Sequence, residues 1–366
     1  MADAKAVDFA AIKANEGSEF KPVQILDNDG NVVNKDLMAN FSDDQLVDFM
    51  KKMVWERALH EQTNAFSKQG RLGFYAPTWG EEASEMGTAA AFKDNDYMVG
   101  AYRDLPQLIQ HGATVEEMYL WSRGHVKGNL FKARAVMPQI IIGAQMVEMA
   151  GCALGLKLNG EDAVAYAYTG DGGTSQGDTY EGMNFASAFQ APAVFIIQDN
   201  GWAISVARKK QTAAKTLAQK AVACGIPSCQ VDGMDVLACY EVAKEAREFA
   251  VKGNGPVMIE TLTYRFGPHS SAGDDPSRYR TKAEEKPWFD KDPLIRLRKY
   301  LTKKNLWSQD EEDKYAASCK DDFKKAIKQA DAEPAEKVSD MLKRTFEVPT
   351  PDIKEEIKKF EAKESK

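Results

Sequence analysis

The chain has no long hydrophobic run. A membrane-spanning helix needs roughly 20 consecutive apolar residues, and the most apolar stretch, residues 140–158, is interrupted by Gln145, Glu148 and Lys157. Residues 1–17 contain neither the apolar core of a secretory signal nor an arginine-rich presequence. The sequence therefore predicts a protein with no membrane segment that resides in the cytoplasm.

Excess positive charge and paired cysteines are also lacking. The formal net charge is −7 at pH 7, which argues against nucleic acid as the main partner, because neutralising phosphates requires a basic surface. The five cysteines include no Cys-x-x-Cys pair, so we expect neither metal binding nor redox chemistry from them. Small buried thiols in a reducing compartment fit this pattern.

Two common nucleotide-binding motifs are absent. There is no Gly-x-x-x-x-Gly-Lys-Ser/Thr loop, and Gly170-x-Gly172 lacks the third glycine of the dinucleotide fingerprint, because Ser175 stands in its place. With 366 residues the chain can still bury a sizeable core.

Helical and strand-like patterns alternate between residues 140 and 265. Such alternation is typical of an α/β fold with a doubly wound, mostly parallel sheet flanked by helices. The predicted helices cover residues 144–158, 176–189, 212–223 and 235–251, and the predicted strands cover 163–169, 193–198, 229–231 and 257–264.

The regions on either side of this pattern differ in composition. Ser42 is a favourable N-cap for a helix over 46–66, and the chain is rich in Lys and Glu after Pro287. We therefore divide the chain into an N-terminal arm (1–42), an α/β domain (43–300) and a helical C-terminal extension (301–366).

Oxygen-bearing side chains follow two of the predicted strands. Asp171 lies within Gly170-Asp171-Gly172-Gly173, and Asn200 follows the next strand. Parallel sheets bind ligands at the carboxyl ends of their strands, and a carboxylate, an amide oxygen and a nearby carbonyl suit Mg²⁺ that also binds phosphate oxygens. The glycines allow a diphosphate to come close, and the following helix N-terminus favours its charge. This segment predicts a metal–diphosphate site.

The same segment resembles the thiamine diphosphate signature, which begins Gly-Asp-Gly and ends Asn-Asn after a similar spacer. Neighbouring residues, Ser175-Gln176-Gly177-Asp178, Glu181 to Ala186 and Trp202-Ala203-Ile204-Ser205, are similar to the alpha subunit of the first, decarboxylating component of 2-oxo acid dehydrogenase complexes. The resemblance runs from Gln69 to Arg280. One departure is Asp199 at the penultimate Asn, which adds a charge beside the site and leaves the metal-binding Asn200 in place.

The resemblance implies thiamine diphosphate and Mg²⁺ as cofactors. Trp202 would add its carbonyl to Asp171 and Asn200 at the metal. Tyr102 and Arg103 would bind the diphosphate. Ile140 and Ile142 would offer backbone groups to the aminopyrimidine ring, and the side chain of Ile204 would support the bent cofactor. The cofactor-binding residues are then expected to be Tyr102, Arg103, Ile140, Ile142, Asp171, Gly172, Gly173, Asn200, Ile204 and His269.

A loop rich in Gly, Pro, Asp and Arg spans residues 267–281. His269 lies in it, just past the end of a predicted strand, and histidine is the side chain whose proton moves near neutral pH. The resemblance implies that it contacts the diphosphate or assists acyl transfer, and we predict His269, Tyr279 and Arg280 as catalytic-loop residues. It also implies that Phe74 and Tyr75 line the 2-oxo acid pocket.

The other histidines are less specific. We expect structural roles for His60 and His111, whereas His125, close to Lys127, stays open between a structural and a functional role. Phosphorylation of Ser270 or Ser277 is a further open question.

Only one doubly wound unit is predicted. The resemblance implies a second, pyrimidine-binding domain with a catalytic glutamate, and Glu81 and Glu82 have no second sheet to carry them. We therefore expect a beta subunit in an α₂β₂ heterotetramer, with a dihydrolipoyl acyltransferase core whose lipoyl domain receives the acyl group, and no nucleic acid or membrane partner.

The expected reaction is oxidative decarboxylation of pyruvate followed by reductive acetylation of lipoyl groups, since residues 75–78 and 140–145 look most like bacterial pyruvate dehydrogenase forms. The alternative within the family is a branched-chain 2-oxo acid substrate. A different class of protein, a non-catalytic scaffold that binds Mg²⁺-nucleotide, is the second alternative.

Overall fold

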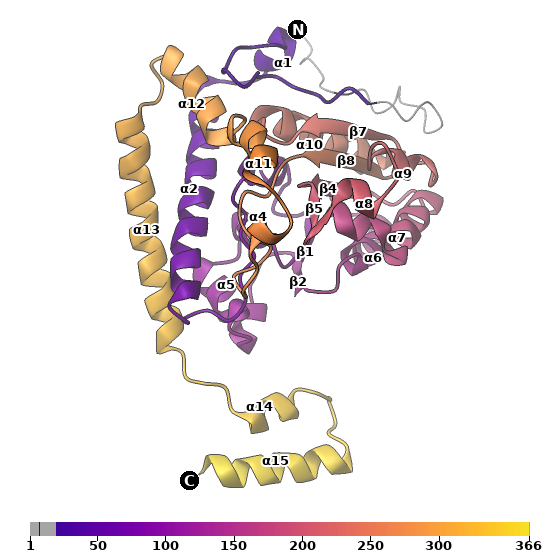
Figure 1. The fold of residues 1–366 in the computed structure, drawn as a ribbon. Coiled ribbons are helices and arrows are strands. Elements are labelled where there is room, and N and C mark those ends of the chain that lie inside the picture. Colours follow the sequence, from indigo (N-terminus) through magenta and orange to yellow (C-terminus); the bar gives the residue numbers. More distant parts are fainter. Residues whose placement is uncertain (1–6, 8–19, 366) are drawn as a thin grey trace.

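A parallel six-stranded sheet forms the centre of the molecule (Figure 1). The computed structural model describes residue 7 and residues 20–365, so residues 1–6 and 8–19 of the predicted arm lie outside the described residues. The strand order is β2-β1-β3-β4-β8-β7, and every neighbouring pair is parallel. The strands are β1 (Tyr97–Ala101), β2 (Ala135–Gln139), β3 (Ala165–Gly170), β4 (Ala193–Asp199), β7 (Ser228–Asp232) and β8 (Val257–Leu262).

Helices cover both faces of the sheet. Because successive strand residues point to opposite sides, Tyr166 and Tyr168 of β3 enter one core and Ala165 and Ala167 enter the other. The tyrosine side is covered by α2 (Asp43–Lys68), α3 (Glu82–Ala89) and α10 (Val236–Phe249), and the alanine side by α6 (Ala144–Leu158) and α7 (Gly177–Ala188). The predicted doubly wound fold is confirmed.

Most predicted elements are found close to their expected bounds. Ser42 caps α2 with a reciprocal capping box to Gln45, and α6 covers the predicted residues 144–158. The edge strand β2, which contains Pro138, was not predicted; proline is tolerated in sheets only at such edges. A short hairpin of β5 (Trp202–Ala203) and β6 (Val206–Ala207) follows β4.

The predicted helix over 212–223 is wrong. Within these residues only the short helix α9 (Gln219–Val222) forms; another short helix, α8 (Arg208–Gln211), ends just before them, and the chain between the two is irregular. The Arg208 guanidinium donates to the carbonyls of Ala214 and Lys215, and the Thr216 hydroxyl accepts from the Gln219 backbone N–H. These side-chain contacts satisfy backbone groups that a continuous helix would have paired internally.

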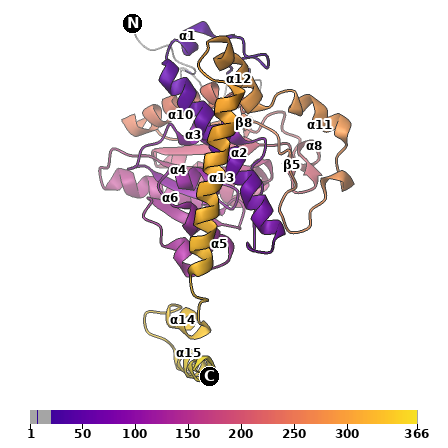
Figure 2. The same cartoon turned by 90° about the vertical axis from the view of Figure 1, so that its left-hand side faces the viewer.

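The C-terminal helices follow the body of the molecule before leaving it. Helix α13 (Gln309–Ala332) lies alongside α2 (Figures 1 and 2), and Phe323 and Ile327 are buried there with Leu59 and Phe66. Helices α14 (Val338–Lys343) and α15 (Pro351–Glu364) lie beyond it, away from the sheet (Figure 1). The division of the chain at residues 42 and 300 stays a prediction.

The remaining helices connect these layers. Within the described residues, none of the helices combines the length and apolarity that a membrane crossing requires. The remaining α-helices are α1 (Lys35–Met38), α4 (Leu105–Gln110), α5 (Val115–Ser122), α11 (Lys282–Phe289) and α12 (Pro293–Lys303). Short 3-10 helices are η1 (Val126–Asn129), η2 (Asp171–Ser175) and η4 (Pro276–Arg278), and η3 (Ala250–Asn254) is a π-helical turn at the end of α10.

Candidate functional site

A cavity of about 300 Å³ opens at the carboxyl ends of β1, β3 and β4, the edge at which a parallel sheet binds ligands. Residues that immediately follow these three strands supply much of its wall. The lining residues are Glu81, Ala101, Tyr102, Arg103, Asp104, Ile142, Thr169, Gly170, Asp171, Gly172, Gly173, Gln176, Gln198, Asn200, Trp202, Ala203, Ile204 and His269. Most of the predicted cofactor-binding residues are therefore brought together in one cavity.

The three predicted metal ligands all line this cavity. Asp171 is 1% exposed, and its Oδ2 is buried without a hydrogen-bond partner. Burial raises the pKa of the Asp171 carboxyl to about 6. The described residues contain no cluster of three or more His, Cys, Asp or Glu side chains that could hold a metal, so a cation here would depend on one carboxylate with amide and carbonyl oxygens. That donor set fits Mg²⁺, which keeps few protein ligands, and the unpartnered carboxylate oxygen is available to it.

Gly172 and Gly173, beside Asp171, line the cavity with backbone alone, because the chain is packed too closely there for a side chain. A Cβ at Gly173 would lie 2.0 Å from the Thr169 Oγ1, and a Cβ at Gly172 would lie 2.8 Å from the Ala203 Cβ. Backbone N–H groups at such a turn can approach an anion closely. The backbone of Gly172 and Gly173, here called the glycine cradle, is therefore what a diphosphate would meet at this wall of the cavity.

Arg103 brings a buried positive charge to the same cavity. Its Nη1 donates to the Pro77 carbonyl, and its Nη2 lies 3.3 Å from His269 Nδ1 and 3.2 Å from the His269 carbonyl. Tyr102 places its ring 5.8 Å from the His269 ring and 5.5 Å from the Phe74 ring. The predicted Tyr-Arg pair thus joins the end of β1 to the predicted catalytic loop.

His269 is held as a neutral imidazole. Since a guanidinium only donates, Nδ1 accepts from Arg103 and the ring proton resides on Nε2. Burial, with further help from Arg103 and Arg265, lowers the pKa of His269 to about 4. Its backbone N–H donates to Asp274 Oδ2 at 2.5 Å, and the Tyr279 hydroxyl donates to the same oxygen at 2.7 Å.

The two other predicted catalytic residues lie behind His269 and do not line the cavity. Tyr279 contacts the loop through Asp274 and accepts from Arg265 Nη2 at 3.0 Å. Arg280 is 5% exposed and donates to three backbone carbonyls, those of Arg265, Phe266 and Gly267. Both hold the loop in place here, and a catalytic role for them stays a prediction.

The predicted isoleucines separate into two groups. Ile142 and Ile204 line the cavity, whereas Ile140 is 63% exposed and does not. Ile204 has a φ of 56°, a left-handed conformation that is costly for a β-branched residue, and its carbonyl accepts from Arg265 Nη2 at 2.7 Å.

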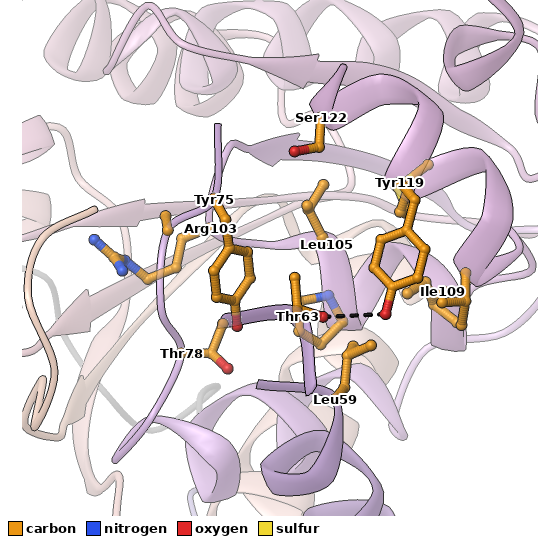
Figure 3. A pocket seen from close by; sticks show the side chains of 13 residues that line it. Leu59, Thr63, Tyr75, Thr78, Arg103, Leu105, Ile109, Tyr119 and Ser122 are labelled. Carbon is orange, nitrogen blue, oxygen red and sulfur yellow. Dashed lines mark hydrogen bonds between the residues drawn. The ribbon is translucent and has the colours of Figure 1, made fainter. Parts of the chain in front are cut away.

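Neither of the predicted substrate-pocket residues, Phe74 and Tyr75, lines the main cavity. Tyr75 and Arg103 line a second cavity of about 20 Å³ among apolar side chains of α2, α4 and α5 (Figure 3). The Tyr75 hydroxyl lies 3.1 Å from His60 Nδ1, and burial lowers the pKa of His60 to about 3. Phe74 reaches the main cavity only through its ring contact with Tyr102. Arg103 is therefore the residue that both cavities share.

Two charged residues of the site were missed by sequence reasoning. Glu81, set aside for want of a second sheet, is fully buried in the cavity wall, where its Oε1 accepts from Asn200 Nδ2 at 3.0 Å. Burial raises the pKa of Glu81 to about 7. Arg265 follows β8 and donates to the Trp202 carbonyl at 3.1 Å. Its position just after a predicted strand could have identified it as a site residue.

The extra charge at Asp199 is paired. Arg208 Nε lies 2.7 Å from Asp199 Oδ2, and Arg208 Nη2 lies 3.9 Å from Glu260 Oε1. Burial, together with the carboxylates of Asp171 and Glu260, raises the pKa of Asp199 well above its usual value. Asp199, the residue that departs from the signature, is therefore paired with Arg208 of α8.

The remaining candidates lie elsewhere. His125 Nε2 lies 3.2 Å from the Pro334 carbonyl, and Lys127 pairs with Glu333, so both contact the C-terminal segment and neither lines the main cavity. His111 Nε2 lies within 3.3 Å of two backbone carbonyls, those of Asp96 and Arg134. All five cysteines are free.

Comparison with known proteins shows the family. The profile of the family described as Dehydrogenase E1 component matches residues 50–339, which include every strand that borders the cavity. The chain is 52% identical over 370 residues to the pyruvate dehydrogenase E1 component subunit alpha of Staphylococcus epidermidis, with all of both chains covered. The protein of the same name from Staphylococcus aureus is equally similar over the same extent. The chain therefore belongs to the dehydrogenase E1 component family.

Proposed function

We propose that this chain is the alpha subunit of a thiamine diphosphate- and Mg²⁺-dependent pyruvate dehydrogenase (acetyl-transferring). The observation that carries the proposal is the cavity in which the unpartnered Asp171 oxygen, Asn200 and the glycine cradle meet at the strand ends. Identity of 52% along the full length of proteins that bear this name supports it.

The residues of the cavity divide the binding task. Asp171, Asn200 and the Trp202 carbonyl would hold Mg²⁺, while Tyr102, Arg103 and the backbone of the glycine cradle would hold the diphosphate. Ile142 and Ile204 would contact the organic part of the cofactor. When bound, thiamine diphosphate supplies the carbon nucleophile that allows a 2-oxo acid to lose its carboxyl group.

The chain itself contributes charge and a proton donor. Neutral His269 can donate from Nε2, because Arg103 occupies Nδ1, and its lowered pKa keeps it neutral at physiological pH. Arg265 and Arg103 add positive charge near the place of the diphosphate. Phe74, whose ring contacts Tyr102, and Tyr75, which lines the small cavity with Arg103, are the proposed walls of the 2-oxo acid pocket.

Partner chains complete the proposed assembly. Helices α6 and α7 leave large apolar side chains exposed, which marks surfaces that pair with other proteins. The exposed side chains are Val147, Leu158, Tyr180 and Phe185, with Phe189 directly after α7. This supports a beta subunit in an α₂β₂ heterotetramer, which would pass acetyl groups to the lipoyl domain of a dihydrolipoyl acyltransferase core. The free cysteines support a reducing, cytoplasmic setting.

Binding experiments test the class of protein. Calorimetry on the chain co-purified with its beta subunit is expected to show Mg²⁺-dependent binding of thiamine diphosphate and none of ATP or GTP. Nucleotide binding without thiamine diphosphate binding would instead support the Mg²⁺-nucleotide scaffold. Turnover of pyruvate is expected to exceed that of 3-methyl-2-oxobutanoate; the reverse order would assign the chain to branched-chain 2-oxo acids.

Replacing His269 by alanine is expected to separate the two half-reactions. Acyl transfer to a lipoyl domain should fall by about 100-fold, a usual contribution of a positioned proton donor. Decarboxylation followed with ferricyanide as an artificial electron acceptor should fall much less. His125→Ala is the matched control, because that histidine lies outside the cavity. An equal loss of both activities in His269→Ala would contradict a role specific to acyl transfer.

A further inference from the structure

A buried carboxylate links the proposed metal ligand to the proposed diphosphate-binding arginine. Glu81 immediately precedes α3 and is fully buried. Its Oε1 accepts from Asn200 Nδ2 at 3.0 Å and lies 3.7 Å from Arg103 Nε. One oxygen atom therefore contacts both residues, although Glu81 and Asn200 are far apart in the sequence.

The contacts of Asn200 decide which end of its amide is oxygen. The Nδ2 donates to Glu81, and the Oδ1 accepts from the Trp202 backbone N–H at 3.2 Å. A flipped amide would set Oδ1 against a carboxylate oxygen and the NH₂ group against an N–H donor, so both contacts would be lost. Because only the oxygen end can coordinate a cation, the orientation that Glu81 fixes is the one a metal ligand needs.

Glu81 also contacts Arg103 through the same oxygen, Oε1. The Arg103 Nη1 and Nη2 are directed at the Pro77 carbonyl and at His269, which leaves the Nε edge toward Glu81. The carboxylate thus contacts the guanidinium on the side that His269 does not use. Removing Glu81 would release the metal ligand and the arginine together.

The backbone before Glu81 is shaped to place it there. Gly80 has a φ of 99°, and a Cβ at this position would lie 2.1 Å from the Tyr264 carbonyl oxygen. The turn therefore requires glycine. On α3, Ser84 donates to Thr261 of β8 at 2.7 Å, which fixes the helix against the sheet. The turn at Gly80 and the packing of α3 on the sheet therefore determine where Glu81 lies.

We propose that Glu81 is a positioning residue of the metal–diphosphate site, which orients the Asn200 amide for the cation and fixes Arg103 for the diphosphate. This inference rests on the proposed function. Partners that orient metal ligands through a hydrogen bond are typically needed for full metal affinity, and their loss costs about 10–100-fold.

Three variants of the complex with the beta subunit test the proposal. Glu81→Ala removes the acceptor, whereas Glu81→Gln keeps an acceptor oxygen for Asn200 but replaces the other oxygen by an NH₂ group and removes the charge that faces Arg103. Glu85→Gln is the matched control, because Glu85 lies one turn further along α3, is equally buried and does not line the cavity. Burial and the neighbouring Glu56 raise the pKa of Glu85 well above its usual value, so glutamine resembles its native protonated form.

The measurement is the dissociation constant of Mg²⁺, from tryptophan fluorescence at saturating thiamine diphosphate, with thermal unfolding as the check of folding. Glu81→Ala is expected to raise this constant by about 10–100-fold, while Glu81→Gln and Glu85→Gln stay close to the unmodified complex. An unchanged constant in folded Glu81→Ala, or a loss in Glu81→Gln as large as in Glu81→Ala, would overturn the positioning role. Failure of the unmodified complex to bind Mg²⁺ and thiamine diphosphate would instead overturn the proposed function.

Discussion

Replacing Asp171 by alanine is expected to reduce binding of thiamine diphosphate with Mg²⁺ by at least about 100-fold, roughly 3 kcal/mol. Asp171 supplies the only carboxylate among the three proposed metal ligands, and its Oδ2 has no protein partner. Without this carboxylate, the protein would offer the cation only the neutral oxygens of Asn200 and Trp202. Calorimetry on the complex measures the loss directly, and near-native affinity would rule out Asp171 as a ligand.

The same replacement is expected to leave the metal-free protein at least as stable as before. Burial raises the pKa of Asp171 from 3.8 to about 6, so the ionised carboxylate destabilises the folded state. This penalty is absent below pH 3.8, grows as the pH rises and is complete above pH 6. Two pKa units correspond to roughly 3 kcal/mol as an upper bound.

Thermal unfolding of the metal-free chain at pH 7.5 and pH 5 tests whether the ionised Asp171 carboxylate destabilises the fold. The midpoint of Asp171→Ala relative to the unmodified chain should be higher at pH 7.5 than at pH 5. Asp162→Ala provides the control, because Asp162 precedes the same strand at its opposite end and is exposed. A strongly destabilised Asp171→Ala chain would mean that lost binding reflects lost folding.

The purified chain alone is expected to have no decarboxylase activity at any concentration of thiamine diphosphate and Mg²⁺. The described residues form one six-stranded sheet and a two-stranded hairpin, which leaves no second sheet for a pyrimidine-binding domain. Adding the beta subunit should restore pyruvate turnover, with activity reaching its plateau near equimolar amounts. Turnover by the chain without its partner, after mass spectrometry has excluded contaminating beta subunit, would contradict the proposed division of the active site.

The part of the site that depends on strand ends could be predicted from the sequence. Asp171 and Asn200 each follow an apolar run, and a parallel sheet brings such ends to one edge. Helix α6 was predicted to the residue: Gly143 precedes it and Asn159-Gly160 follow it, and the mostly apolar stretch between them is long. These features depend on local sequence and on one general rule of topology.

Contacts between distant segments could not be predicted in this way. Glu81 meets Asn200 only because Gly80 turns the chain and α3 packs on the sheet, and neither fact is local to residue 81. The incorrect helix over 212–223 has a similar cause, since Arg208 binds carbonyls that the helical pattern would have used. Tertiary contacts override local propensity at both places.

The left-handed conformation of Ile204 bears on preorganisation. Such a conformation costs on the order of 1–3 kcal/mol and persists only where the surroundings enforce it. Ile204 lies in the two-residue turn of the β5-β6 hairpin, where a positive φ is usual, and Arg265 donates to its carbonyl. That cost belongs to the folding of the chain, since the conformation is present without any ligand. A molecule that enters the cavity therefore meets an apolar support already in place and loses less affinity to reorganisation of the protein.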